Sequence, residues 1–160
     1  MWLLRISIPE PLPFTRDLFH DDRADVDAST VLWRTLVAIP FGTVLMEEIT
    51  FRGALPAMFR RRTANSTHPA LRADVYAALL FGAWHALPTL DLSASNDTLR
   101  SLLPGPLGVI ATVAGAVVAT GLYGMLLSQL RNRSDSLVAP AMLHWSTNSI
   151  GYVLAWLVQQ

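Results

Sequence analysis

The sequence predicts an all-α protein, a polytopic bundle of about four transmembrane helices behind a polar N-terminal leader. Hydrophobic residues make up 52% of the 160 residues and charged residues only 15%, with a mean hydropathy of +0.37. This composition is too apolar for a typical water-soluble domain. The apolar residues also gather in long uncharged segments, and about 20 such residues suffice to cross a bilayer as a helix. We therefore expect one transmembrane domain over residues 30–160, after a leader over residues 1–29.

The leader and the first apolar segment differ sharply in charge. The leader contains prolines and an acidic run from Asp17 to Ser29, which is typical of a solvated segment. The first apolar segment runs from about Thr30 to Phe59 and includes Pro40 and Pro56. Because proline interrupts the hydrogen bonding of a helix, we expect two helices here or one kinked helix.

Three further apolar segments follow. The second, from Val75 to Leu90, has no formal charge and is short for a full span. The third lies between Arg100 and Arg131 and contains no charged residue over a length that is ample for a span. The fourth, residues 136–160, has no formal charge when its histidine is neutral. Four alternating spans are the simplest arrangement of these segments.

The charges outside the apolar segments indicate an orientation and exclude some functions. The loops after the first and third segments are rich in arginine, with Arg60, Arg61, Arg62 and Arg72 in one and Arg131 and Arg133 in the other. The positive-inside rule places these loops in the cytoplasm. The formal net charge is zero, so no basic field exists to recruit nucleic acid, and the absence of cysteine excludes disulfides and thiolate sites.

Three apolar segments carry ionisable side chains at one predicted depth. Similar lengths of chain separate Glu47 from Arg60, His85 from Arg72, and His144 from Arg133. At ~1.5 Å per helical residue, all three side chains lie roughly 16–20 Å from the arginine-rich loops. Ionisable groups inside a membrane are costly and usually functional, so a shared depth favours a common site.

Helical spacing divides the polar residues by role. Adjacent residues of a helix point about 100° apart, so Glu47 and Glu48 are not both expected to face one pocket. Glu48 and Arg52 are spaced i,i+4 and can pair, which offsets the cost of burying each charge. A structural role is therefore favoured for this pair, and Glu47 is the glutamate that we expect to take part in a reaction.

The same spacing relates the other candidates. His144 and Asn148 share one face of the fourth segment, and Phe81 lies one turn before His85, where it can pack beside the imidazole. Interhelical hydrogen bonding is the alternative role for His144 with Asn148. The tryptophans and tyrosines, Trp84 and Tyr123 among them, are interpreted as packing residues or interface anchors.

Glu, His, His and Asn in a membrane cavity fit a hydrolase for amide bonds. A carboxylate and an imidazole that share a water can take its proton and direct it at a carbonyl carbon. A second histidine and an asparagine amide can donate to the resulting oxyanion. The competing assembly is a Zn²⁺ site formed by Glu47, His85 and His144 with an open position for water. The sequence alone leaves both open.

Three motifs carry a family resemblance. They are EEITFR from Glu47, FGAWH from Phe81 and HWSTN from His144, which follow the patterns EExxxR, FxxxH and HxxxN in order on the predicted spans. Together with their flanking sequences they resemble the CPBP family, which comprises CAAX-type intramembrane proteases, including Ras-converting enzyme, and bacteriocin-processing or self-immunity (Abi) proteins. The resemblance extends over about residues 40–152.

The resemblance implies an α-helical intramembrane endopeptidase that cleaves near the C-terminus of a membrane-associated protein or peptide. It implies that Glu47 is the general base, that His85 helps to hold the water, that His144 and Asn148 form the oxyanion hole, and that Glu48 and Arg52 support the site. Members are often classed as metalloproteases, although a glutamate-activated water without a metal is also argued, so a zinc cofactor stays open.

The resemblance also sets expectations about surroundings. It implies a bacterial cell membrane, a cavity open to the cytoplasm, and the lipid bilayer and a peptide substrate as partners. A non-catalytic scaffold or self-immunity protein of the same family is the alternative. Members usually have more helices before the first motif, so we expect a minimal version of the fold or a chain that lacks N-terminal helices.

Overall fold

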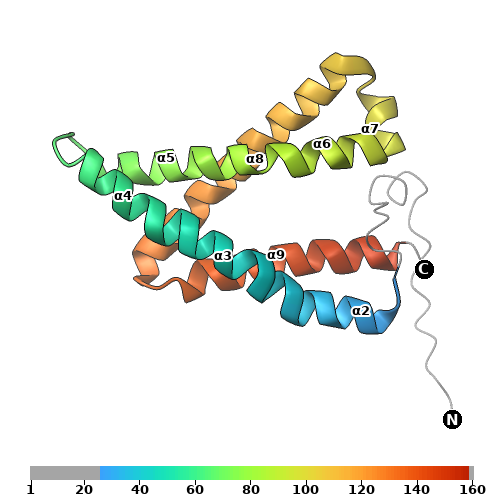
Figure 1. Ribbon diagram of the computed structural model, residues 1–160, viewed down its shortest axis with the longest axis horizontal. Helices are drawn as coiled ribbons and strands as arrows, with labels where there is room; N and C mark the ends of the chain where they lie inside the picture. The colour runs from blue at the N-terminus through green and yellow to red at the C-terminus, as the bar shows by residue number, and fades with distance from the viewer. Residues whose placement is uncertain (1–25, 159–160) are drawn as a thin grey trace, which may run out of the picture.

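The computed structural model describes residues 26–158, and within that range the regular structure is helical, with no strand. The helices, drawn in Figure 1, are α2 (Ala28–Trp33), η2 (Arg34–Val44), α3 (Leu45–Glu48), η3 (Ile49–Ala54), α4 (Leu55–Arg62), α5 (Pro69–Trp84), α6 (Ala86–Ser95), α7 (Asp97–Leu102), α8 (Gly105–Ser134) and α9 (Val138–Leu157). The leader expected over residues 1–29 lies almost wholly outside the described residues. Only its end, residues 26–29, is described, and the first described helix begins there, at Ala28.

The first apolar segment forms one continuous helix of 35 residues from Ala28 to Arg62. Asp27 caps its start by accepting hydrogen bonds from the Thr30 backbone and the Ser29 hydroxyl. The segments η2 and η3 are π-helical, and η2 contains Pro40. Wider π-type turns are one way in which a helix accommodates a residue that cannot donate to the preceding turn. The prolines therefore change the helical geometry here without dividing the helix.

The second apolar segment is divided at His85, where α5 ends and α6 begins. Helix α5 starts at Pro69, before the expected boundary at Val75, and His85 has φ −83° and ψ −1°, outside ideal helical geometry. Its amide bonds to the Gly82 carbonyl and its own carbonyl accepts from the Thr89 hydroxyl. The apolar segment that the sequence indicates over residues 75–90 therefore contains parts of two helices, which meet at His85.

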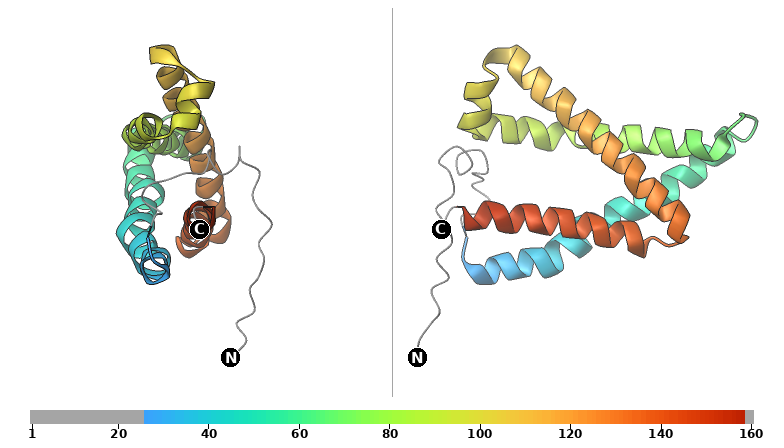
Figure 2. Two further views of the ribbon diagram at one scale, coloured as in Figure 1. Left: turned by 90° about the vertical axis from the view of Figure 1, so that its right-hand side faces the viewer. Right: turned by 180° about the vertical axis from the view of Figure 1, so that it is seen from behind.

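The helices cross the molecule repeatedly, with the arginine-bearing turns at one end. In Figures 1 and 2, the α4–α5 turn and the α8–α9 turn lie at one end, and the start of α2, the end of α9 and the α6–α7 region lie at the other. Helix α9 runs beside η2, and α8 packs across α5. We call the first end the arginine end, because it holds Arg60, Arg61, Arg62, Arg72, Arg131 and Arg133.

A polar cluster fastens three helices near the arginine end. Asn132 of α8 donates to the buried Asp74 of α5 over 2.7 Å. Arg60 of α4 donates to the Asn132 side chain and lies 3.7 Å from the Asp74 carboxylate. These contacts close the turn between α4 and α5 against α8.

Two helices are long and apolar enough to cross a membrane, Ala28–Arg62 and Gly105–Ser134. Their most apolar stretches are only 17% and 6% buried inside the protein, unlike the core helix of a soluble protein. Large apolar side chains such as Leu107, Leu122 and Phe41 are mostly exposed. Such surfaces are suited to lipid contact. Two spans are thus supported, and the expectation of four stays a prediction, since α5 has only 16 residues.

Close packing of α5 on α8 depends on Gly82. A Cβ atom at this position would lie 2.4 Å from the Val117 backbone oxygen of α8. Small residues that permit such approach are typical of helix interfaces in membranes. Ala78, Phe81 and Leu127 are buried beside it.

Replacement of Gly82 by alanine should therefore destabilise the fold by about 1–3 kcal/mol, because the added methyl group forces two backbones apart. Gly115→Ala on α8 is the matched control, since a Cβ there meets nothing within 4 Å. Thermal unfolding of both variants in detergent micelles measures the effect. Equal stability of the two variants would contradict the close-packing argument.

Candidate functional site

The two adjacent glutamates face different surroundings, as their helical phase predicts. Glu48 is fully buried, whereas Glu47 is partly exposed and lines an open cavity. Both nevertheless reach the same residue of α9. Glu48 Oε1 lies 2.8 Å from His144 Nδ1, and Glu47 Oε2 lies 3.6 Å from His144 Nε2. His144 therefore stands between the two carboxylates.

Glu48 and Arg52 form the buried ion pair that their spacing predicts. The distance from Glu48 Oε1 to Arg52 Nη1 is 3.2 Å, and both side chains are 1% exposed. The Arg52 guanidinium also lies over the Phe81 ring, 4.0 Å from its centroid. Phe81 in turn packs edge-on against His144 and His85. Phe81 thus contacts both histidines and the arginine.

The Glu48 contact fixes the proton of His144. An ionised carboxylate only accepts hydrogen bonds, so Nδ1 carries the proton that is shared with Glu48. The other ring nitrogen, Nε2, faces Glu47. Tyr123 of α8 packs edge-on against the imidazole, with ring centroids 6.0 Å apart, and shares a hydrogen bond with Thr147.

Glu47 is held from a second side by Trp84 of α5. The indole Nε1–H donates to Glu47 Oε1 over 3.1 Å, and the indole ring packs near Phe51. Glu47 Oε2 is buried and has no hydrogen-bond partner within the described part of the chain. One carboxylate oxygen is therefore positioned by Trp84, and the other is buried 3.6 Å from His144 Nε2.

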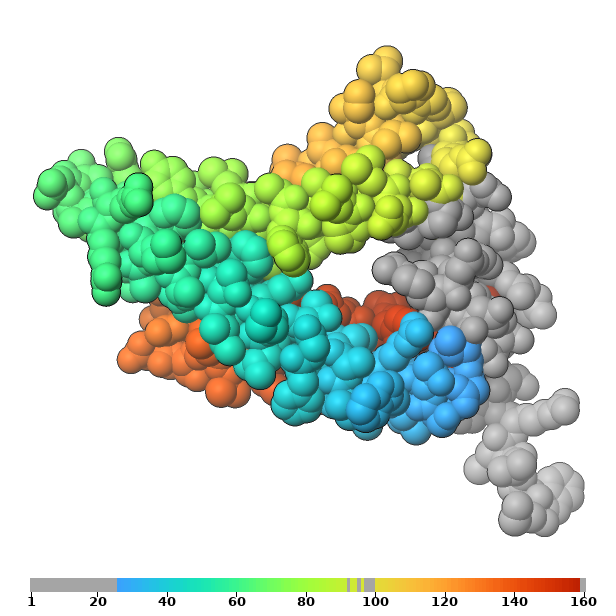
Figure 3. Space-filling model, viewed as in Figure 1, coloured from blue at the N-terminus to red at the C-terminus, as the bar shows by residue number. Residues whose placement is uncertain are grey.

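A cavity of about 700 Å³ is lined by three of the four candidate catalytic residues, whereas His144 is buried and does not line it. Glu47 of α3, His85 at the α5–α6 junction and Asn148 of α9 all line it. It continues from Glu47 past Thr43 and Ala38 toward the start of the first helix. Figure 3 shows the hollow between α5–α6 and η2, with α9 behind it. The cavity therefore extends away from the arginine end.

His85 presents one particular ring nitrogen to this cavity. Its Nδ1 lies 2.8 Å from the Phe81 carbonyl, which can only accept, so Nδ1 carries the proton. In a neutral imidazole Nε2 then has a free lone pair. His85 can thus accept a hydrogen bond from a molecule in the cavity.

The zinc site proposed from the sequence does not assemble in this arrangement. Within residues 26–158, no three His, Asp or Glu side chains gather in a way that could hold a metal ion. Glu47 Oε2 and His144 Nε2 lie 3.6 Å apart, but His85 does not join them in a group that could hold a metal ion. As they stand, these residues do not fit a three-ligand zinc centre.

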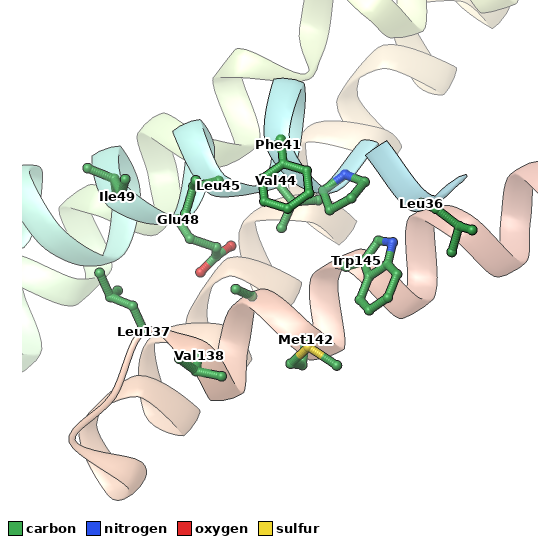
Figure 4. Close-up of a pocket in the computed structure, with 12 residues that line it drawn as sticks. Leu36, Phe41, Val44, Leu45, Glu48, Ile49, Leu137, Val138, Met142 and Trp145 are labelled. Atoms are coloured by element: carbon green, nitrogen blue, oxygen red, sulfur yellow. The ribbon is translucent and has the colours of Figure 1, made fainter. Parts of the chain in front are cut away.

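A second, apolar groove of about 310 Å³ lies between the first helix and α9. Figure 4 shows the Glu48 carboxylate directed into the space between these helices, among Leu45, Leu137 and Met142. Its Oε2 has no hydrogen-bond partner within the described residues. Glu48 lines this groove and contacts His144 Nδ1, whereas Glu47 lines the candidate cavity and faces His144 Nε2.

Sequence reasoning missed three contributors. Trp84 and Tyr123 were interpreted as packing residues or interface anchors, yet Trp84 bonds Glu47 and Tyr123 contacts His144. Arg34 was not considered, although it lines the cavity. The position of Trp84 next to His85 was the one sequence signal that could have found it.

Removal of one member of the buried pair should cost the fold stability. Arg52→Met leaves the Glu48 charge without its cation, and breaking a buried pair in this way costs about 3–5 kcal/mol. The control is Arg133→Met, the same change at an exposed arginine, which should alter stability by under about 0.5 kcal/mol. Chemical denaturation in micelles compares the two. An equal loss in both variants would show that the Glu48–Arg52 pair is not a special support.

Comparison with known proteins gives a family. No curated protein and no solved structure matches the chain. The family model described as type II CAAX prenyl endopeptidase Rce1-like matches residues 29–150, which contain all three motifs. The match covers most of the chain and includes every residue of the candidate site. The protein therefore belongs to the Rce1-like family of type II CAAX prenyl endopeptidases.

Proposed function

We propose that this protein is an intramembrane endopeptidase that hydrolyses a peptide bond of a membrane-associated protein or peptide with a water activated by Glu47 and His85. The observation that carries the proposal is the single cavity lined by Glu47, His85 and Asn148, which come from three separate segments of the chain. The family supplies the class of reaction, which is cleavage of a CAAX-type tail.

In the first step Glu47 acts as general base. A water in the cavity donates one hydrogen bond to His85 Nε2 and its other proton to the Glu47 carboxylate. The water oxygen attacks the carbonyl carbon of the substrate, and the carbonyl oxygen becomes an oxyanion. Trp84 holds the carboxylate in place through its indole N–H.

In the second step the oxyanion is stabilised and the amine leaves. The Asn148 amide and the imidazole of His144 are the donors for the oxyanion. His144 can donate from Nε2 only in its protonated form, because Nδ1–H is already shared with Glu48. With Glu47 protonated, the negative charges of Glu48 and the oxyanion then balance the Arg52 guanidinium and the His144 imidazolium. Glu47 finally returns its proton to the leaving nitrogen, and the peptide bond breaks.

Glu47→Gln should lower the rate of cleavage by about 10²–10⁴-fold, because an amide cannot take the proton of the water. Glutamine keeps an acceptor for Trp84, so the fold should be retained. The substrate is a fluorescent peptide that ends in S-farnesylcysteine and three further residues, the class that the family name indicates.

The matched control is Asp135→Asn, the same change of acid to amide at a side chain that is 98% exposed. This variant should cleave at the rate of the wild type. Undiminished cleavage by Glu47→Gln would overturn the mechanism. Absence of cleavage by the wild type, with a cellular phenotype that Glu47→Gln retains, would favour the non-catalytic scaffold.

The direction in which the cavity opens is related to the orientation of the protein in the membrane. The positive-inside rule places the arginine end in the cytoplasm. The cavity extends from Glu47 toward the opposite end, so on this topology it opens away from the cytoplasm. The cytoplasmic opening implied by the family resemblance requires the reverse topology. We propose the topology that the six arginines favour.

Single cysteines test this topology, since the chain has none of its own. Ala64→Cys, in the α4–α5 turn, and Ala28→Cys, at the start of α2, are both exposed alanines at opposite ends. In intact cells a membrane-impermeant maleimide should label Cys at position 28 and not at position 64, and both after lysis. Labelling of position 64 alone would show instead that the cavity opens to the cytoplasm.

A further inference from the structure

The cavity contains a threonine hydroxyl that the mechanism above does not use. Thr43 lies one turn before Glu47 on the first helix, its side chain is exposed, and both residues line the cavity. A hydroxyl on a helix inside a membrane normally needs a hydrogen-bond partner, because lipid tails supply none. The presence of Thr43 beside the proposed general base therefore requires an explanation.

The Thr43 hydroxyl differs from those of other threonines in these helices. Several donate to the backbone carbonyl one turn earlier, over 2.7–3.0 Å, namely Thr35, Thr89, Thr112 and Thr120. The Thr43 hydroxyl has no hydrogen-bond partner among residues 26–158. It is therefore able to rotate toward a molecule in the cavity and to donate one hydrogen bond to it.

Thr43 and the proposed oxyanion donor Asn148 lie on facing helices. Helix α9 runs antiparallel to the first helix, since its end lies beside the start of α2 (Figure 2). Glu47 and His144 contact each other between these helices. Thr43 precedes Glu47 by four residues and Asn148 follows His144 by four, so both lie about 6 Å from this contact, in the same direction.

The direction of helical side chains brings the reacting atoms toward Thr43. Side chains of a helix lean toward its N-terminus, so the Glu47 carboxylate leans toward Thr43. A carbonyl carbon attacked by the water at Glu47 can then place its oxygen between Thr43 and Asn148, which line the cavity from two different helices. His144, the other proposed donor, is buried and does not line the cavity. Thr43 thus offers a donor inside the cavity itself.

We propose that Thr43 is a catalytic residue whose hydroxyl donates a hydrogen bond to the oxyanion, opposite the Asn148 amide. The proposal rests on the proposed function, because the oxyanion forms only when water attacks the substrate. The hydroxyl keeps its proton throughout, and the hydrogen bond weakens when the amine leaves and the carbonyl is restored. Such a donor stabilises the transition state more than the bound substrate, so its removal lowers kcat rather than raising KM.

Thr43→Val tests this role, because it replaces the hydroxyl by a methyl group and leaves the branched shape of the side chain. With the S-farnesylcysteine peptide, the variant should lower kcat and kcat/KM equally, by about 10²–10³-fold, as expected for a donor that acts only in the transition state. Thr43→Ser keeps the hydroxyl and should restore most of the rate. Steady-state kinetics in micelles gives kcat and KM separately.

The matched control is Thr50→Val, the same change on the same helix at a half-buried side chain that does not line the cavity. It should cleave at the rate of the wild type. A Thr43→Val variant as fast as this control, a raised KM with unchanged kcat, or a Thr43→Ser variant as slow as Thr43→Val would overturn the role of Thr43.

Failure of the proposed function would give a different result. Cleavage by Glu47→Gln at the rate of the wild type would overturn the general base and leave the threonine comparison intact, because Thr43→Val and Thr50→Val both retain Glu47. Absence of cleavage by the wild type would overturn both proposals, since no oxyanion then forms.

Discussion

The buried contact of Glu48 with Arg52 and His144 is the interaction on which the rest of the site depends. A carboxylate inside a helix bundle is tolerated only when it is paired and hydrogen-bonded. Glu48 obtains one partner from its own helix and one from α9, while Arg52 rests on the Phe81 ring of α5. One cluster thus joins three helices. Since Glu47 immediately precedes Glu48 in the same helix, fixing Glu48 also limits where Glu47 can point.

The sequence was sufficient for the parts of this site that follow from local spacing. The i,i+4 relation paired Glu48 with Arg52, and the phase difference separated Glu47 from Glu48. Both are properties of one helix. The equal predicted depths of Glu47 and His144 also had a physical basis, because depth along the bilayer normal can be compared between helices that cross the same bilayer. In the structure these two side chains do approach each other. Their catalytic roles stay predictions.

What could not be predicted depends on the rotation and crossing of different helices. The bond between Trp84 and Glu47 joins residues 37 positions apart, and the Arg34–Tyr152 contact joins residues 118 apart. No periodicity relates such positions. The break at His85 was missed for another reason: the surrounding residues all favour helix or span, and the local geometry depends on hydrogen bonds of the residue's own ring and carbonyl. The direction of the cavity likewise depends on which face of α9 meets η2.

The adjacent acids share one imidazole because His144 of α9 lies within reach of both carboxylates. Glu47 and Glu48 belong to a single α-helical turn between η2 and η3, and π-type turns often accompany functional sites in helices. A phase difference of about 100° would normally send one of two adjacent side chains to lipid. Here α9 lies close enough for His144 to fill the angle between them, with one ring nitrogen toward each. The imidazole therefore connects the two carboxylates, so that a change at Glu48 reaches Glu47 through a single ring. Two consecutive charges are thus accommodated in an otherwise apolar helix, because Arg52 and His144 hold Glu48 while Trp84 holds Glu47.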